Sequence, residues 1–138
     1  MAQALILDCE ALSALAFATQ RSVAARRARA ILQVAYEEHA LVRVPAPVLA
    51  EVYRGGDRDA PVDRVLNDRG IEVVDLTRTM AKRAGALLGR ARLGSAHAVD
   101  AFVIATALAF SSAVIATHDP DDFRRLAAGQ PTLRIFAI

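Results

Sequence analysis

Short apolar runs recur along the chain, and each is bounded by polar residues or by Gly and Pro. Runs of this length that are rich in Val, Ile and Leu are typical of strands buried on both faces of a parallel sheet. The run at 113–117 gives the strongest signal of this kind. The sequence predicts strands at residues 4–7, 41–44, 71–74, 113–117 and 133–136.

Between these runs, apolar residues recur at intervals of three and four, which is the spacing of an amphipathic helix. In segment 23–38 they share one face, and the arginines and glutamates fall mainly on the other; we expect Thr19 or Ser22 to cap this helix. Segment 98–110 is apolar on nearly every side, which is typical of a central, buried helix. Helices are predicted at 10–18, 23–38, 48–53, 62–68, 78–92, 98–110 and about 120–128, with a polar loop at 54–61.

Strands that alternate with helices predict an α/β fold in which helices cover a parallel sheet and the connections are right-handed. A chain of 138 residues fits one domain, and its 54% of hydrophobic residues can supply a full core. The loop at 54–61 does not look like a domain boundary, because neither side could form a core alone. We therefore expect a single domain over residues 1–138.

Charge and cysteine content narrow the function only slightly. The net charge of +2 is too small to indicate a nucleic-acid partner, although the pI near 9.2 leans that way. Lys82 is the only lysine among 17 basic residues, and the many arginines fit either phosphate binding or a biased base composition of the gene. Cys9 is the only cysteine, which excludes an intrachain disulfide and favours a reducing, cytoplasmic compartment. Without an obvious histidine partner, we interpret Cys9 as a small buried residue rather than a nucleophile.

Two longer apolar stretches do not predict secretion or membrane insertion. Residues 11–18 resemble the apolar part of a signal peptide, but no basic residue precedes them, and Asp8 and Glu10 flank them. Residues 98–113 contain Asp100 and are shorter than the ~20 residues that a membrane-spanning helix needs. We expect a soluble protein with no membrane partner.

Four acidic residues lie where apolar residues would be expected. Asp8 directly follows the first predicted strand, and Asp119 lies just after the fourth. Because the carboxyl ends of parallel strands open on the same side of the sheet, both acids would lie at one edge. Asp100 shares the inward face of the most apolar helix, and its place in the first turn suits the same edge. Glu51 lies inside the short apolar helix after the second strand.

Carboxylates that meet at one place repel one another and raise each other's pKa, so such a cluster favours a bound cation. Oxygen ligands without a Cys or His cluster indicate Mg²⁺ or Mn²⁺. Ions held in this way can activate water and stabilise the charge of an attacked phosphodiester, which is nuclease chemistry. The sequence has no Walker-type glycine loop, which argues against an NTPase.

Each acid taken alone also has a structural interpretation. Asp8 and Asp119 could simply cap the helices that follow them, and the Asp-Pro-Asp-Asp sequence at 119–122 has the form of a helix start. Glu51 could lie at the boundary of an amphipathic helix. Asp100 is the hardest to explain by packing, because an acid on an apolar face is seldom there for stability. The four acids together favour a functional site.

Neighbouring polar residues could support this site. Thr117 could hydrogen-bond a carboxylate or a water of the metal, or merely suit a strand, and Asp122 is a candidate for the outer ligand shell. Glu10 either points to the same edge or favours a helix N-terminus electrostatically. His97 and His118 could titrate near the site, although single histidines are more often structural or surface residues.

The order and spacing of these residues resemble those of PIN-domain proteins, and specifically of VapC-type toxin ribonucleases. The resemblance covers essentially the whole chain, and its motifs are weak singly but fairly specific in combination. It implies a three-layer α/β/α fold around a central, mostly parallel sheet of four to five strands. The motifs are Leu5-Ile6-Leu7-Asp8, Pro47-Val48-Leu49-Ala50-Glu51-Val52, Val99-Asp100-Ala101-Phe102-Val103-Ile104-Ala105-Thr106-Ala107 and Ile115-Ala116-Thr117-His118-Asp119.

The resemblance implies that Asp8, Glu51, Asp100 and Asp119 form an acidic quartet that binds Mg²⁺ or Mn²⁺. Asp8 and Asp100 would be direct ligands, and Glu51 and Asp119 would bind directly or through water. Proteins like this cut RNA, usually structured RNA such as tRNA, by attack of a metal-activated water. They are typically homodimers, and a VapB-like antitoxin silences them by wrapping the toxin and presenting a basic side chain to the acidic pocket.

The sequence departs from the family pattern directly after Asp8. The family commonly has Thr or Ser there, followed by Ser or Asn, whereas this chain has Cys9 and Glu10. A hydroxyl that usually supports the site is lost, and an extra carboxylate is gained. The main competing interpretation is a non-catalytic PIN-fold module that binds RNA or protein. A phosphatase with Asp8 as nucleophile fits less well, because such sites want a second Asp where this chain has Glu10.

Overall fold

The sheet has five strands, and all of them are parallel. The computed structural model describes residues 3–19, 21–68 and 70–138. The strand order is β3-β2-β1-β4-β5, so the first strand lies at the centre. All five predicted strands are confirmed to within one residue at each end. They are β1 (Gln3–Leu7), β2 (Leu41–Pro45), β3 (Ile71–Val74), β4 (Ser112–Thr117) and β5 (Leu133–Ala137).

The predicted helices are also confirmed, with ends displaced by at most three residues. The hydroxyl of Ser22, rather than that of Thr19, caps the second helix by accepting a hydrogen bond from the backbone N–H of Ala25. Among the described residues, no helix combines the length and the apolar character needed to cross a membrane. The α-helices are α1 (Cys9–Ala16), α2 (Val23–Glu37), α3 (Ala46–Val52), α4 (Ala60–Leu66), α5 (Arg78–Ala91), α6 (Ala98–Ala107) and α7 (Pro120–Leu126).

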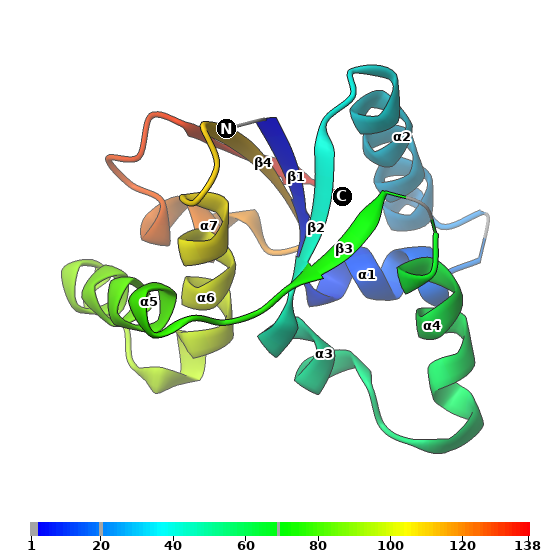
Figure 1. Ribbon diagram of the computed structural model, residues 1–138, viewed down its shortest axis with the longest axis horizontal. Helices are drawn as coiled ribbons and strands as arrows, with labels where there is room; N and C mark the ends of the chain where they lie inside the picture. Colours follow the sequence, from blue (N-terminus) through cyan, green and yellow to red (C-terminus); the bar gives the residue numbers. More distant parts are fainter. Residues whose placement is uncertain (1–2, 20, 69) are drawn as a thin grey trace.

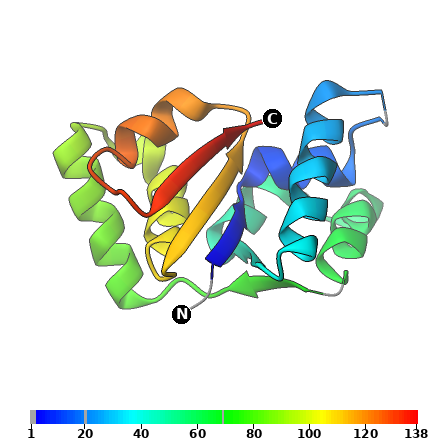
Figure 2. The same ribbon diagram turned by 90° about the horizontal axis from the view of Figure 1, so that it is seen from above.

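The helices form two layers with the sheet between them (Figures 1 and 2). Helices α1, α2 and α4 pack together on one face, and α5, α6 and α7 pack together on the other. The short helix α3 directly follows β2 and contacts both α1 and α6. This arrangement confirms the expected three-layer α/β/α fold. It also brings the first turns of α1, α3, α6 and α7 toward the carboxyl edge of the sheet.

The segment at 54–61 is more ordered than the predicted loop. It contains a short 3₁₀ helix, Gly56–Asp59, and α4 begins at Ala60. The carboxylate of Asp59 folds the segment back on itself by accepting hydrogen bonds of 2.9 Å from the backbone N–H groups of Arg54 and Gly55. Gly55 has a φ of 91°, which side-chain-bearing residues rarely adopt. The loop prediction was wrong because a polar composition does not reveal such local hydrogen bonds.

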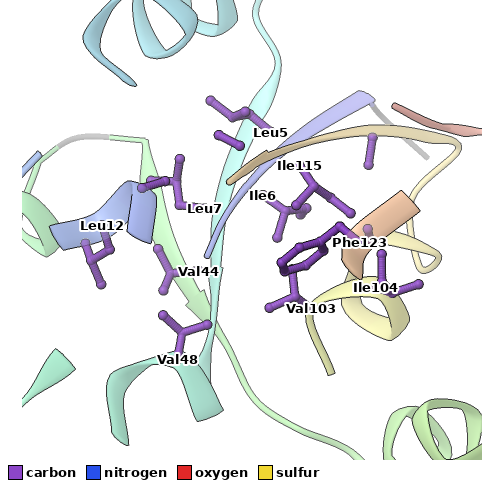
Figure 3. Packing of buried hydrophobic residues seen from close by; sticks show 14 of the residues in the cluster. Leu5, Ile6, Leu7, Leu12, Val44, Val48, Val103, Ile104, Ile115 and Phe123 are labelled. Atoms are coloured by element: carbon purple, nitrogen blue, oxygen red, sulfur yellow. The ribbon is translucent and has the colours of Figure 1, made fainter. Parts of the chain in front are cut away.

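The core fills both faces of the central strand, as Figure 3 shows. On one face, Ile6 lies against Phe123 of α7 and the α6 residues Val103 and Ile104. On the other, Leu7 points toward α1. These side chains are almost completely removed from solvent. A strand packed so tightly on both sides holds the residue that follows it, Asp8, in a fixed position.

Candidate active site

Asp8 and Thr117 lie side by side at the carboxyl edge of the sheet. Strands β1 and β4 are neighbours, with Leu7 paired to Ala116, so the next residue of each strand reaches the same level. From β1 the chain goes on to β2 on one side of the sheet, and it later returns to β4 on the other. Ligands of parallel sheets bind at such a reversal of strand order, beyond the carboxyl ends.

Asp8 is a buried carboxylate with only 3% of its surface exposed. It caps α1, because its Oδ1 accepts a hydrogen bond of 2.8 Å from the backbone N–H of Ala11. Burial raises the pKa of Asp8 to about 7, and the negative charges of Glu10 and Asp100 add to this shift. Hydrogen bonds from the Thr117 side chain and the Ala11 N–H act in the opposite direction on the pKa. Asp8 is therefore both a helix cap and a carboxylate whose ionisation is costly.

Thr117 links the two strand ends through its hydroxyl. Its Oγ1 accepts a hydrogen bond of 3.0 Å from the backbone N–H of Asp119, and its side chain hydrogen-bonds Asp8. Since Oγ1 is already an acceptor, the hydroxyl hydrogen is available for the Asp8 carboxylate. The residue is fully buried. The family pattern commonly has a hydroxyl directly after the first Asp, which this chain lacks. The neighbouring strand supplies a hydroxyl to Asp8 instead.

Asp100 lies in the first turn of α6 and is about half buried. Burial raises its pKa to about 6, and the negative charge of Glu51 contributes next. The charges of Asp122 and Asp119 raise it further, and His97 lowers it. The structure therefore brings Asp100 within electrostatic reach of Glu51 and Asp119, and Asp8 within reach of Asp100.

Glu51 and Asp119 lie at the rim of this group, and both are exposed. Glu51 is near the end of α3, and Asp119 is the residue before α7. In the part of the chain that the structure describes, the Asp119 side chain makes no capping hydrogen bond to α7, so the capping alternative does not account for it. Both residues are accessible to solvent.

A second grouping joins Asp100 to His97 and Asp122, two residues that the sequence indicated only as possible neighbours of the site. The Nδ1 atom of His97 lies 4.0 Å from Oδ2 of Asp100 and 3.7 Å from Oδ2 of Asp122. One ligand atom from each residue falls within 4.8 Å of the others, which is a spacing that could hold a metal ion. The spacing of His97 and Asp100 by three residues was a possible signal, whereas their proximity to Asp122 depends on the packing of α6 against α7.

The surroundings of Cys9 disfavour its thiolate form. Burial raises the pKa of its thiol to about 12, and the charges of Asp8, Glu51, Glu10 and Asp100 contribute to the shift. A thiol is nucleophilic as its thiolate, which these surroundings suppress at neutral pH. The sequence predicted a small buried residue rather than a nucleophile; Cys9 is only partly buried, and its raised thiol pKa fits the second part of that interpretation.

The donor set fits a hard divalent cation. Among residues 3–19, 21–68 and 70–138, no arginine or lysine forms an ion pair with Asp8, Glu51, Asp100 or Asp119. Several carboxylates that share one neighbourhood without a cationic side chain repel one another, and a bound ion would relieve that repulsion. Carboxylate oxygens are the donors that Mg²⁺ and Mn²⁺ prefer.

Comparison with known proteins places this arrangement in context. The model of the PIN domain family matches residues 5–129. No curated protein sequence gives a significant match. Among solved structures, the crystal structure of VapBC2 from Rickettsia felis bound to a DNA fragment from their promoter is similar over 97% of this chain and 98% of the other, with a TM-score of 0.66 and 16% identity. A toxin–antitoxin complex from Klebsiella pneumoniae is similar over 97% and 99%, with a TM-score of 0.66 and 20% identity.

Proposed function

The chain belongs to the PIN domain family, and we propose that it is the toxin of a toxin–antitoxin pair, an endoribonuclease that depends on Mg²⁺ or Mn²⁺. One observation carries the proposal. Acids from four separate elements share one electrostatic neighbourhood at the reversal of strand order, and among the described residues no arginine or lysine forms an ion pair with them. A purely structural role would not require so many unpaired carboxylates at one place.

In this proposal the carboxylates of Asp8 and Asp100 bind the ion directly, and Glu51 and Asp119 bind it directly or through water. Asp122 and Thr117 support them from outside. When bound, a divalent ion supplies positive charge to an attacked phosphodiester and lowers the pKa of a water molecule.

The protein's own part is to hold these carboxylates in place. Hydrogen bonds from Ala11 and Thr117 fix Asp8, and its position follows a strand that is packed on both faces. Asp100 and Asp122 lie in the first turns of α6 and α7, where the partial positive charge of a helix N-terminus favours a carboxylate. The site is therefore built before any ligand arrives, which lowers the cost of organising it during the reaction.

The proposed partners follow from the family and from the similar structures. Those structures are a VapBC2 assembly and a toxin–antitoxin complex, which supports an antitoxin as the partner of this chain. RNA, such as tRNA or another structured RNA, is the proposed substrate. A homodimer and a cytoplasmic location complete the proposal.

Expression of the chain without its antitoxin tests the enzymatic part. We expect growth arrest and new RNA 5′ ends, mapped by sequencing, and we expect both to disappear in Asp100→Asn. If the purified protein cleaves no RNA with Mn²⁺, and Asp100→Asn behaves like the unmodified chain in cells, the enzyme proposal fails. Titration calorimetry with Mn²⁺ then distinguishes the remaining alternative, because a non-catalytic binding module has no need of a metal site.

A further inference from the structure

A surface groove of about 320 Å³ begins beside the acidic site and runs along the outside of α1. Its lining combines Glu10 and Ser13 of α1, and Phe17 directly after α1, with His118 and Ile138. Its volume is within the range of roughly 300–1,000 Å³ that is typical of sites for small organic groups. None of the roles assigned above to the acidic residues uses this groove.

The groove adjoins the acidic site at two points of the chain. Glu10 lies two residues after Asp8, and its charge acts on the Asp8 carboxyl. His118 lies between Thr117 and Asp119. A polymer whose backbone reaches the acids would thus have room for a neighbouring group in the groove.

Two exposed rings, those of Phe17 and His118, line the groove. Phe17 follows α1 and leaves 47% of its surface exposed, although a phenyl ring gains stability from burial. His118 is also exposed, and its Nδ1 lies 3.0 Å from the carbonyl oxygen of Ile138, which fixes the ring. Exposed aromatic and histidine rings are the surfaces on which unpaired RNA bases stack.

Two polar groups of the groove, the Glu10 carboxylate and Nε2 of His118, can accept hydrogen bonds. Because the carbonyl of Ile138 can only accept, Nδ1 of neutral His118 carries the hydrogen and Nε2 is left as an acceptor. Glu10 is exposed, and it shares one face of α1 with Ser13 and Phe17, at positions three and seven residues further on. A carboxylate accepts two hydrogen bonds side by side, which matches the adjacent N1–H and N2–H donors of guanine.

We propose that this groove holds one unpaired base of the RNA substrate, that Phe17 stacks on it, and that Glu10 selects a base with an amino group, guanine above the others. The inference rests on the proposed function, since it assigns the base next to the cleaved phosphate. It explains the departure from the family pattern at Glu10 as a determinant of substrate choice. Uracil fits least well, because it lacks an exocyclic amino group.

Binding measurements separate this inference from catalysis. In an Asp100→Asn background, fluorescence anisotropy would compare oligouridine dodecamers that carry a single central guanosine, adenosine or cytidine. We expect the guanosine RNA to bind most tightly and Phe17→Ala to weaken binding of every RNA about tenfold. Phe17→Leu keeps the apolar volume without the aromatic ring and should bind almost as weakly. Val73→Ala, at another exposed apolar residue, is the matched control and should bind as the parent does.

Glu10→Gln tests the choice of base. It should remove the preference for guanosine, whereas Glu38→Gln at the end of α2 should not. If Glu10 instead binds the metal, Glu10→Gln will lower the affinity for Mn²⁺ and leave the base preference intact. That result would overturn the proposal.

The two proposals can fail separately. If the unmodified chain cleaves RNA but Phe17→Ala matches Val73→Ala and base identity has no effect, only the groove assignment is wrong. If Phe17→Ala loses binding of the antitoxin and keeps that of RNA, the groove belongs to the protein partner, and the assignment is again overturned. If no RNA is cleaved but the base preference and its loss in Glu10→Gln are observed, the groove stands and the nuclease proposal falls.

Discussion

The side chain of Thr117, at the end of β4, hydrogen-bonds the buried carboxylate of Asp8, at the end of β1. The same hydroxyl accepts a hydrogen bond from the backbone N–H of Asp119. One buried oxygen thus connects two of the acids proposed to bind the metal. This connection makes Thr117 a positioning residue whose role can be tested without altering any carboxylate.

Replacing Thr117 with Val should weaken the site while preserving the shape of the core. The Asp8 carboxylate loses a hydrogen bond that favours its ionised form, and the Asp119 N–H loses its acceptor. We expect Mn²⁺ affinity and RNA cleavage to fall by roughly 10- to 100-fold, the usual cost of removing such a supporting contact. Thr117→Ser retains the hydroxyl and should restore most of both. Equal losses in Val and Ser variants, measured by calorimetry and cleavage assay, would show that the hydroxyl is not responsible.

The metal-free protein should lose stability as the pH rises. Asp8 has a pKa of about 7 in the folded protein and near 3.8 in the unfolded chain, so the folded state keeps a proton that the unfolded state has released. The contribution of this proton is complete below about pH 4 and is lost as the pH rises through 7. Asp100, with a pKa of about 6, acts in the same direction. Urea unfolding in EDTA should therefore give a higher free energy of unfolding at about pH 5 than at about pH 8. A rise over that range would contradict the prediction.

Mn²⁺ should reverse this pH trend, because a cation favours the ionised carboxylates. The increase in melting temperature on adding Mn²⁺ should be larger at about pH 8 than at about pH 5. Ca²⁺ at the same concentration is the control for ionic strength and for the size of the ion. An increase that is independent of pH would place the ion away from Asp8 and Asp100.

Asp8→Asn should stabilise the metal-free protein at pH 8 while abolishing Mn²⁺ binding. The amide oxygen can still accept the N–H of Ala11 and cap α1, but the buried charge is gone. One pKa unit corresponds to about 1.4 kcal/mol, and the pKa of Asp8 rises from 3.8 to about 7, so the gain in the free energy of unfolding should be at most about 4 kcal/mol. Chemical denaturation of both proteins in EDTA measures the difference. A less stable variant would mean that the cap, rather than the charge, dominates at this position.

His97→Asn should lower Mn²⁺ affinity, because His97 lies between Asp100 and Asp122 and its charge favours the ionised form of Asp100. We expect a loss of several-fold, smaller than that of Asp100→Asn. His39→Asn is the matched control: His39 is exposed and has a φ of 56°, a conformation that Asn tolerates. Calorimetry that shows equal affinities for the two variants would exclude His97 from the metal site.

The fold and three of the acids could be predicted because their positions depend on local patterns. Asp8 and Asp119 follow buried strands, and the parallel arrangement of those strands puts their ends at one edge. Asp100 stands out as a charge on the most apolar helix. Each of these inferences uses only residues close in sequence, together with one rule about parallel sheets.

What the sequence did not reveal depends on contacts between distant elements. The sequence named Asp122 and Thr117 as candidates for supporting the site but did not identify their partners. The approach of Asp122 to His97 results from the packing of α7 against α6, and the hydrogen bond from Thr117 to Asp8 requires the exact register of β4 on β1. The groove at Phe17 likewise forms only where α1 meets the residues after β4 and β5. The spacing of residues along the chain does not predict such contacts between distant elements.

The central position of β1, with β4 as its neighbour, also determines the stage of synthesis at which the acidic site can be completed. Asp8 leaves the ribosome before Thr117 and Asp119, which are translated more than 100 residues later. A nascent chain therefore lacks a complete acidic site until β4 has emerged and inserted beside β1. If the proposed activity holds, a polypeptide that does not yet include β4 cannot cleave RNA, and the antitoxin is needed only after β4 has emerged.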